Sequence, residues 1–107
     1  MSDDFTPVSG EFLLYETEDG RTRVECRFVD NTLWLSQAGM ADLFQVKVPT
    51  VNEHLKKLYA EGEIRPEATI RQYLMVRQEG RRQVNRHIDH YNLDAILAVG
   101  YRVRSPR

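Results

Sequence analysis

Five arginines gather between residues 71 and 86, and arginine is the side chain best suited to bind phosphate. Its guanidinium is permanently charged and donates paired hydrogen bonds to one anion. These residues are Arg71, Arg77, Arg81, Arg82 and Arg86. The segment is rich in branched and aromatic residues on both sides of Glu79-Gly80, which predicts an exposed hairpin over residues 69–91. We predict that Arg77, Arg81 and Arg82, at its tip, contact the phosphates of a nucleic acid.

A second set of polar side chains precedes this hairpin in the sequence. Residues 36–62 have the pattern of a short helix, a tight turn and a second helix, with small Ala41 at the crossing and Val46 in the turn. In a helix-turn-helix this pattern projects the start of the second helix into the major groove. The predicted base-facing residues are Thr50, Asn52 and Glu53, and the predicted phosphate contacts are Lys47, Lys56 and Lys57. An ordinary helical hairpin that binds nothing is the alternative.

Enzymatic chemistry is not expected. The run His87-Ile88-Asp89-His90 could suggest a metal site, but on a strand His90 points away from His87 and Asp89. The single cysteine, Cys26, alternates with apolar neighbours and is predicted to be a buried, unreactive thiol. No phosphate-binding glycine loop, nucleophile elbow or zinc-protease motif occurs. We therefore expect no catalytic residues, no metal and no cofactor.

Composition limits the class of protein. The chain has 107 residues, 41% hydrophobic and 29% charged, which is typical of one soluble globular domain. It contains no apolar run long enough to cross a membrane, and its first residues are acidic, unlike a signal peptide. We expect a cytoplasmic protein that has no membrane partner.

Charge is distributed unevenly along the chain. Residues 1–64 carry 6 basic and 12 acidic side chains, whereas residues 65–107 carry 9 arginines and 4 acids. The arginine-rich part can attract a polyanion although the net charge of the chain is -1. The acidic residues 1–64 favour the alternative that the chain binds a protein partner.

The remaining elements follow from hydrophobic periodicity. Residues 1–10 are predicted to be a disordered lead-in, and residues 11–105 one domain. Three strands, at about 11–17, 21–28 and 32–35, form an antiparallel β-meander over residues 11–35, with the side chain of Arg27 on the solvent face. Asn92 is predicted to cap a final helix over residues 92–100, which Gly100 ends. This order predicts an α+β fold: a winged helix-turn-helix with an amino-terminal β-meander.

Three segments of the sequence closely resemble the virulence protein RhuM family. They are LWLSQAGMADLF at residues 33–44, PTVNEHLK at 49–56 and HYNLDAILAVGYRV at 90–103. The resemblance implies a bacterial protein of a group regarded as DNA-binding, some of whose relatives are linked to Fic/Doc-type toxin domains. Members are typically longer, so we expect either an amino-terminal fragment or a short version. Where members often have glycine at the turn, this chain has Gln45.

Together these observations predict a non-catalytic, regulatory domain that binds double-stranded DNA as a homodimer on a two-fold site. The alternative is a protein-interaction module that docks an effector or toxin partner. The salt dependence of DNA binding distinguishes the two, because it is steep only where phosphates are neutralised.

Overall fold

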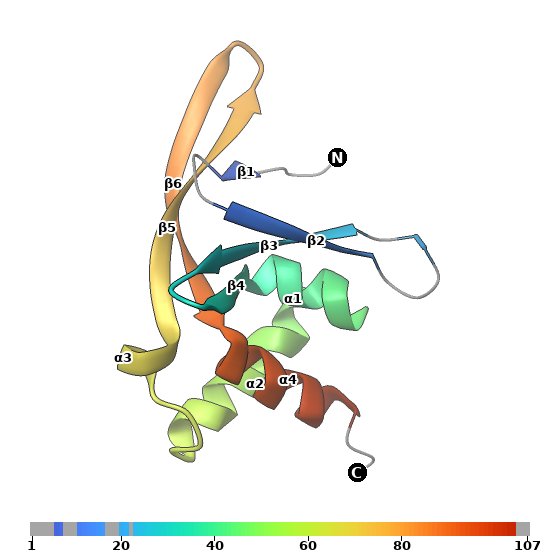
Figure 1. The fold of residues 1–107 in the computed structure, drawn as a ribbon, viewed down its shortest axis with the longest axis vertical. Coiled ribbons are helices and arrows are strands. Elements are labelled where there is room, and N and C mark those ends of the chain that lie inside the picture. Colours follow the sequence, from blue (N-terminus) through green and yellow to red (C-terminus); the bar gives the residue numbers. More distant parts are fainter. Residues whose placement is uncertain (1–5, 8–10, 17–19, 22, 105–107) are drawn as a thin grey trace.

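The computed structural model describes residues 6–7, 11–16, 20–21 and 23–104. In this part of the chain a six-stranded antiparallel sheet and four helices form an α+β fold (Figure 1). The strands are β1 (Thr6–Pro7), β2 (Glu11–Glu16), β3 (Arg23–Val29), β4 (Thr32–Ser36), β5 (Ile70–Glu79) and β6 (Arg82–Asn92). The helices are α1 (Gln37–Phe44), α2 (Val48–Ala60), α3 (Pro66–Thr69) and α4 (Leu93–Arg104).

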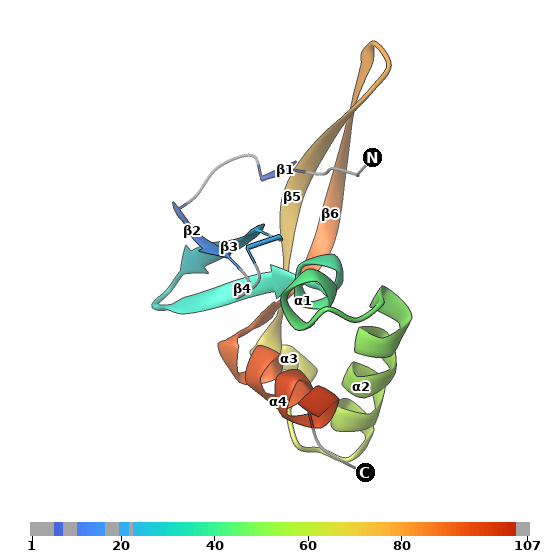
Figure 2. The same cartoon turned by 90° about the vertical axis from the view of Figure 1, so that its right-hand side faces the viewer.

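The order of strands across the sheet is β1-β5-β6-β4-β3-β2. Strands β2, β3 and β4 form the predicted meander, and β5 and β6 form the predicted hairpin. The two parts join where β4 pairs with β6, with Leu35 opposite Tyr91. Both side chains are buried in the core beneath the helices, so this pairing fixes the base of the hairpin against the body. The far end of the hairpin extends well beyond the body (Figures 1 and 2).

Three helices cover the joined part of the sheet. The largest fully buried side chains are Met40 of α1, Val51 and Leu58 of α2, and Val99 of α4. Because each helix contributes to one cluster, the core links the middle of the chain to its last helix. In Figure 2, α1 lies in front of the hairpin base, with α2 and α4 on opposite sides below it.

The structure confirms the α+β class and contains each predicted helix and strand, with approximately the predicted bounds except at the end of the last helix. The predicted disordered lead-in, residues 1–10, lies outside the described residues except for Thr6–Pro7. Those two residues form β1, in which Thr6 is opposite Val76 of β5. The short helix α3 is a further difference, because four residues are too few to produce a periodic pattern.

The predicted end of the last helix was wrong. Helix α4 continues through Gly100 to Arg104. A Cβ atom on Gly100 would lie 2.8 Å from Cζ of Phe44 in α1, closer than van der Waals contact allows. Gly100 therefore leaves room for the Phe44 ring against α4 and does not cap the helix. The predicted start is confirmed, because Oδ1 of Asn92 accepts a hydrogen bond from the Ala95 amide at 3.2 Å.

Candidate nucleic-acid interface

Helix α1, a three-residue turn and helix α2 form a compact helical pair. Ser36 begins α1, and its Oγ accepts a hydrogen bond from the Gly39 amide at 3.1 Å. Ala41 is buried, and its carbonyl accepts from the Val46 amide at 3.0 Å, which closes the turn. The half-buried Val46 packs against the core. Ala41 is thus buried as expected of a small residue in this pair, and Val46 lies in the turn as predicted.

The turn depends on a residue with left-handed backbone geometry. Gln45 ends α1 with a φ of 59° and a ψ of 47°, a conformation that glycine adopts more easily than residues with a Cβ. The Gln45 side chain offsets part of this cost, because its Nε2 donates to the Asp42 carbonyl at 2.6 Å. A glutamine can therefore occupy the turn position.

Helix α2 presents a polar face to solvent because its apolar side chains face the core. Val51, Leu55 and Leu58 are buried. Of the residues predicted to contact DNA from this segment, five are exposed and Asn52 is half-buried. Oδ1 of Asn52 accepts a hydrogen bond from Nε2 of Gln37 at 3.2 Å, so this acceptor is already engaged with α1. The exposed five are Thr50, Glu53, Lys47, Lys56 and Lys57.

The tip of the hairpin carries two exposed arginines. Strands β5 and β6 are connected by Gly80 and Arg81, and Gly80 has a φ of 62°. Arg81 and Arg82 have no ion-pair partner among the described residues. Arg77 differs from them, because its guanidinium forms an ion pair with Glu79 and its side chain is 31% exposed. The charge of Arg77 is therefore partly neutralised within its own strand.

The base of the hairpin is fixed by arginines stacked on aromatic rings. The Arg71 guanidinium lies 4.5 Å from the centre of the Trp34 ring and donates to Asp30 at 2.9 Å. Arg27 lies 4.2 Å from the centre of the Tyr73 ring. Such stacking is favourable because an aromatic face is electron-rich. Arg71 therefore holds the hairpin against the β3–β4 turn.

Arg27 corrects one detail of the sequence interpretation. Strand alternation placed it on a solvent face, yet it is 7% exposed. The reason is tertiary: Tyr73, on the hairpin, covers it. Burial lowers the pKa of the Arg27 guanidinium, and the nearby Tyr73 opposes that shift.

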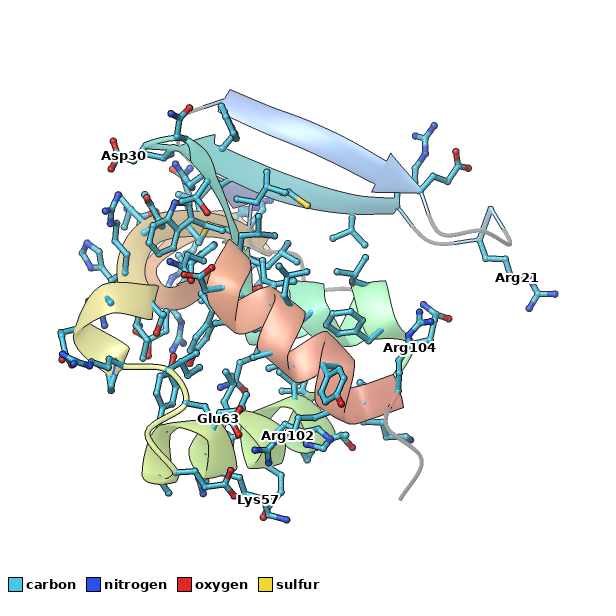
Figure 3. All side chains as sticks on the ribbon, turned by 60° about the horizontal axis from the view of Figure 1, so that its bottom comes forward. Arg21, Asp30, Lys57, Glu63, Arg102 and Arg104 are labelled. Carbon is cyan, nitrogen blue, oxygen red and sulfur yellow. The ribbon has the colours of Figure 1, made fainter. Side chains whose placement is uncertain are left out.

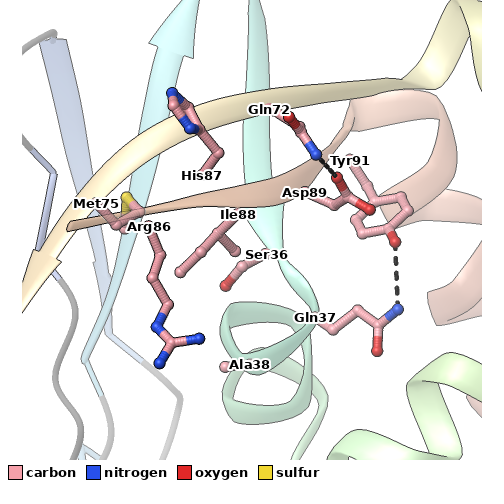
Figure 4. A pocket seen from close by; sticks show the side chains of 10 residues that line it. All are labelled: Ser36, Gln37, Ala38, Gln72, Met75, Arg86, His87, Ile88, Asp89 and Tyr91. Atoms are coloured by element: carbon pink, nitrogen blue, oxygen red, sulfur yellow. Dashed lines mark hydrogen bonds between the residues drawn. The ribbon is translucent and has the colours of Figure 1, made fainter. Parts of the chain in front are cut away.

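A groove of about 640 Å³ lies between the start of α1 and the hairpin (Figure 4). Nε2 of Gln37 donates to the Tyr91 hydroxyl as well as to Asn52, at 3.2 Å in each case. Across the hairpin, Nε2 of Gln72 donates to Asp89 at 3.1 Å. Burial raises the pKa of Tyr91, and the hydrogen bond from Gln37 opposes this shift. The groove is thus a polar surface beside the predicted contact residues.

Gln37 and Tyr91 were not found by sequence reasoning. They are 54 residues apart, and no local pattern links a glutamine in the first turn of a helix to a tyrosine near the end of a strand. The pairing of β4 with β6 brings them together. Gln37 connects the hairpin base to α2 through one amide group.

Other polar clusters give no additional site in the described part of the chain. His90 is buried, and its Nδ1 lies 2.8 Å from the Ile88 carbonyl, whereas His87 is exposed. No group of three His, Cys, Asp or Glu side chains among these residues could hold a metal ion. Cys26 is buried as predicted, and burial raises the pKa of its thiol. None of the helices described is long and apolar enough to cross a bilayer.

The fold and site define a small α+β domain in which a helical pair lies beside an arginine-rich hairpin. Residues 68–107 match the model of the virulence protein RhuM family, and this stretch is less than half of the chain. The match includes β5, β6 and α4, and it agrees with the resemblance in the segment at residues 90–103. The helical pair lies outside the matched residues. No curated protein and no solved structure matches the chain.

Proposed function

We propose that this protein is a non-catalytic domain that binds double-stranded DNA through a winged helix-turn-helix. The arrangement of elements supports this proposal. Helices α1 and α2 follow β4 and precede the hairpin, and β6 lies between β4 and β5 in the sheet. A winged helix-turn-helix needs such an arrangement, with a two-stranded wing beside the helical pair.

One observation carries the proposal. The hairpin projects from the body (Figure 1). Its tip carries two exposed arginines, Arg81 and Arg82, that have no ion-pair partner among the described residues. An exposed ribbon needs no such charges for its own stability, and a flexible arginine at its tip can reach a phosphate.

The roles of the other residues follow from their surroundings. We assign base contacts to the exposed Thr50 and Glu53, and phosphate contacts to Lys47, Lys56 and Lys57. Asn52 is assigned a base contact through its amide nitrogen, because its oxygen is bound to Gln37. Arg77 makes a weaker phosphate contact because of its pairing with Glu79.

The first prediction concerns the hairpin tip. We expect the double substitution Arg81→Ala and Arg82→Ala to weaken binding of a labelled random-sequence duplex equally for all sequences. Each phosphate contact contributes about -0.9 to the slope of log K against log salt, so losing two makes the slope shallower by about 2. Fluorescence anisotropy at several salt concentrations measures both quantities.

The matched control removes the same charge elsewhere. Arg23 and Arg65 are exposed and lie outside the hairpin, so Arg23→Ala with Arg65→Ala should leave the salt slope unchanged. An unchanged slope in the tip variant, with loss of sequence discrimination, would refute the phosphate assignment. No DNA binding at low salt would instead favour a protein-interaction module.

The second prediction concerns base recognition. We expect Asn52→Ala to change the sequences selected from a random duplex pool, with a preference loss of about 1–3 kcal/mol at one position. The salt slope should remain that of the unaltered protein, because no phosphate contact is lost. If Asn52→Ala selects the same duplex sequences as the unaltered protein, and its slope of log K against log salt becomes shallower, Asn52 does not face a base. The comparison uses selection followed by sequencing, with Thr50→Ala in parallel.

A further inference from the structure

A second surface lies away from the hairpin tip. An open groove of about 860 Å³ lies on this surface. It is lined by residues of helix α4, the end of α1 and strands β3 and β4. Its walls are mainly apolar, from Leu33 and Leu43 on one side to Leu97 and Tyr101 of α4 on the other. Figure 3 views this region with α4 in front and Arg104 near the end of that helix.

The outer side of α4 is apolar and exposed. Leu97 is 61% exposed and Tyr101 77%, the two highest values among the exposed large apolar side chains described. Leu93 continues the same stripe one turn earlier, because residues four apart lie on one face of a helix. These side chains border the groove without covering it.

Charged residues flank this stripe in a symmetric order. Asp94 lies three residues before Leu97, and Arg104 lies three residues after Tyr101. The spacing 94-97-101-104 is therefore the same when α4 is read in either direction. An antiparallel copy of α4 would place Asp94 opposite Arg104 and Leu97 opposite Tyr101, in both halves of the pair.

The side chains of Asp94 and Arg104 are free to form these ion pairs between two copies. Asp94 and Arg104 are exposed and have no ion-pair partner among the described residues. Arg102 differs, because it points toward α2 and forms ion pairs with Glu61 and Glu63, which directly follow that helix (Figure 3). Antiparallel helices also bring the negative end of one dipole close to the positive end of the other.

We propose that the occupant of this groove is a second copy of the chain, which docks through antiparallel α4 helices related by a two-fold axis. A two-fold interface must be complementary to itself, and the charge order of α4 satisfies this requirement. Leu97 and Tyr101 of each copy enter the groove of the other. Helix α2 lies on the far side of α4 from this face (Figures 1 and 2), so the interface leaves α2 and the hairpin tip accessible. The proposal does not depend on DNA binding.

Sedimentation equilibrium of the full chain tests this interface without DNA. We expect a mass twice that of one chain, and we expect Leu97→Glu to raise the dimer dissociation constant at least about tenfold, because it places an unpartnered charge in an apolar interface. Val48→Glu is the matched control, since Val48 is 42% exposed but lies on α2. The Val48→Glu variant should sediment with the mass of a dimer, as the unaltered protein does. Circular dichroism checks that each variant is folded.

Charge exchange tests the antiparallel register. Asp94→Arg alone and Arg104→Asp alone should each weaken the dimer, and the two substitutions together should restore it. A monomer at every concentration would overturn the proposal. A dimer that is insensitive to Leu97→Glu would do the same, as would a monomeric chain that binds a different protein through this groove.

Discussion

His90 is a buried histidine beside the base of the hairpin, 4% exposed and in edge contact with the Tyr73 ring at 5.2 Å. Burial lowers the pKa of this histidine, and the positive charge of Arg27 lowers it further. The hydrogen bond from its ring to the Ile88 carbonyl opposes these effects. The folded protein therefore favours the neutral form of His90 more strongly than the unfolded chain does.

The third prediction is a pH dependence of stability at the scale of this residue. The unfolded chain takes up the proton at a pKa of about 6.5, above that of the folded state, so the free energy of unfolding falls as the pH drops below about 6.5. Urea unfolding at about pH 7.5 and about pH 5.5 measures the difference. His90→Gln should reduce it, and His87→Gln is the matched control, an exposed histidine on the same strand. An equal dependence in the His90 variant would refute the assignment.

At the scale of elements, the turn between α1 and α2 is set by a strained residue. Gln45 adopts a φ of 59° although its Cβ disfavours this conformation. The strain costs up to about 1 kcal/mol relative to glycine, and the exposed hydrogen bond to Asp42 recovers part of it. The helical pair thus keeps its geometry at a small cost in stability.

The fourth prediction follows from that strain. We expect Gln45→Gly to raise the free energy of unfolding by about 0.5 kcal/mol, since relief of strain exceeds the lost hydrogen bond. Gln45→Ala should lower it, because alanine keeps the strained φ without the side-chain hydrogen bond. Urea denaturation of both variants measures the two changes. If Gln45→Gly lowers the free energy of unfolding, the side chain of Gln45 stabilises the protein by more than its left-handed backbone conformation destabilises it.

At the scale of the whole molecule, one core joins segments that are distant in the sequence. Tyr91, Ala95, Ile96 and Val99 lie in the part that matches the RhuM family, but they pack against side chains of earlier elements. The earlier members of this cluster include Leu35, Met40, Val51, Leu55 and Leu58. Without these earlier elements, the hairpin and α4 therefore lose most of the apolar side chains against which they pack.

The fifth prediction concerns the independence of this segment. We expect a peptide of residues 68–107 to show no cooperative thermal transition by circular dichroism, whereas the full chain unfolds in a single transition. The physical reason is that a hairpin and one helix without a shared core cannot offset the entropy of ordering the chain. A sigmoidal melt of the peptide would show that the helical pair is not needed for folding.

The sequence by itself determined the longer elements and their order, but not β1 or α3. Alternation around Val24 and Cys26, the helical spacing of Val51, Leu55 and Leu58, and the turn at Gly80 are local patterns, and each correctly predicted a strand, a helix or a hairpin. The exposed arginines at the hairpin tip followed from the same patterns, because a turn between two polar strand ends lies in solvent.

Only the tertiary structure decided which side chains meet. The pairing of β4 with β6 places Gln37 beside Tyr91, and the packing of the hairpin on the meander buries Arg27 under Tyr73 and binds Arg71 to Asp30. It also places α4 against α1, which is why Gly100 lies inside a helix that continues to Arg104. These contacts join residues far apart in the chain, and their energies depend on packing and burial that no local spacing specifies.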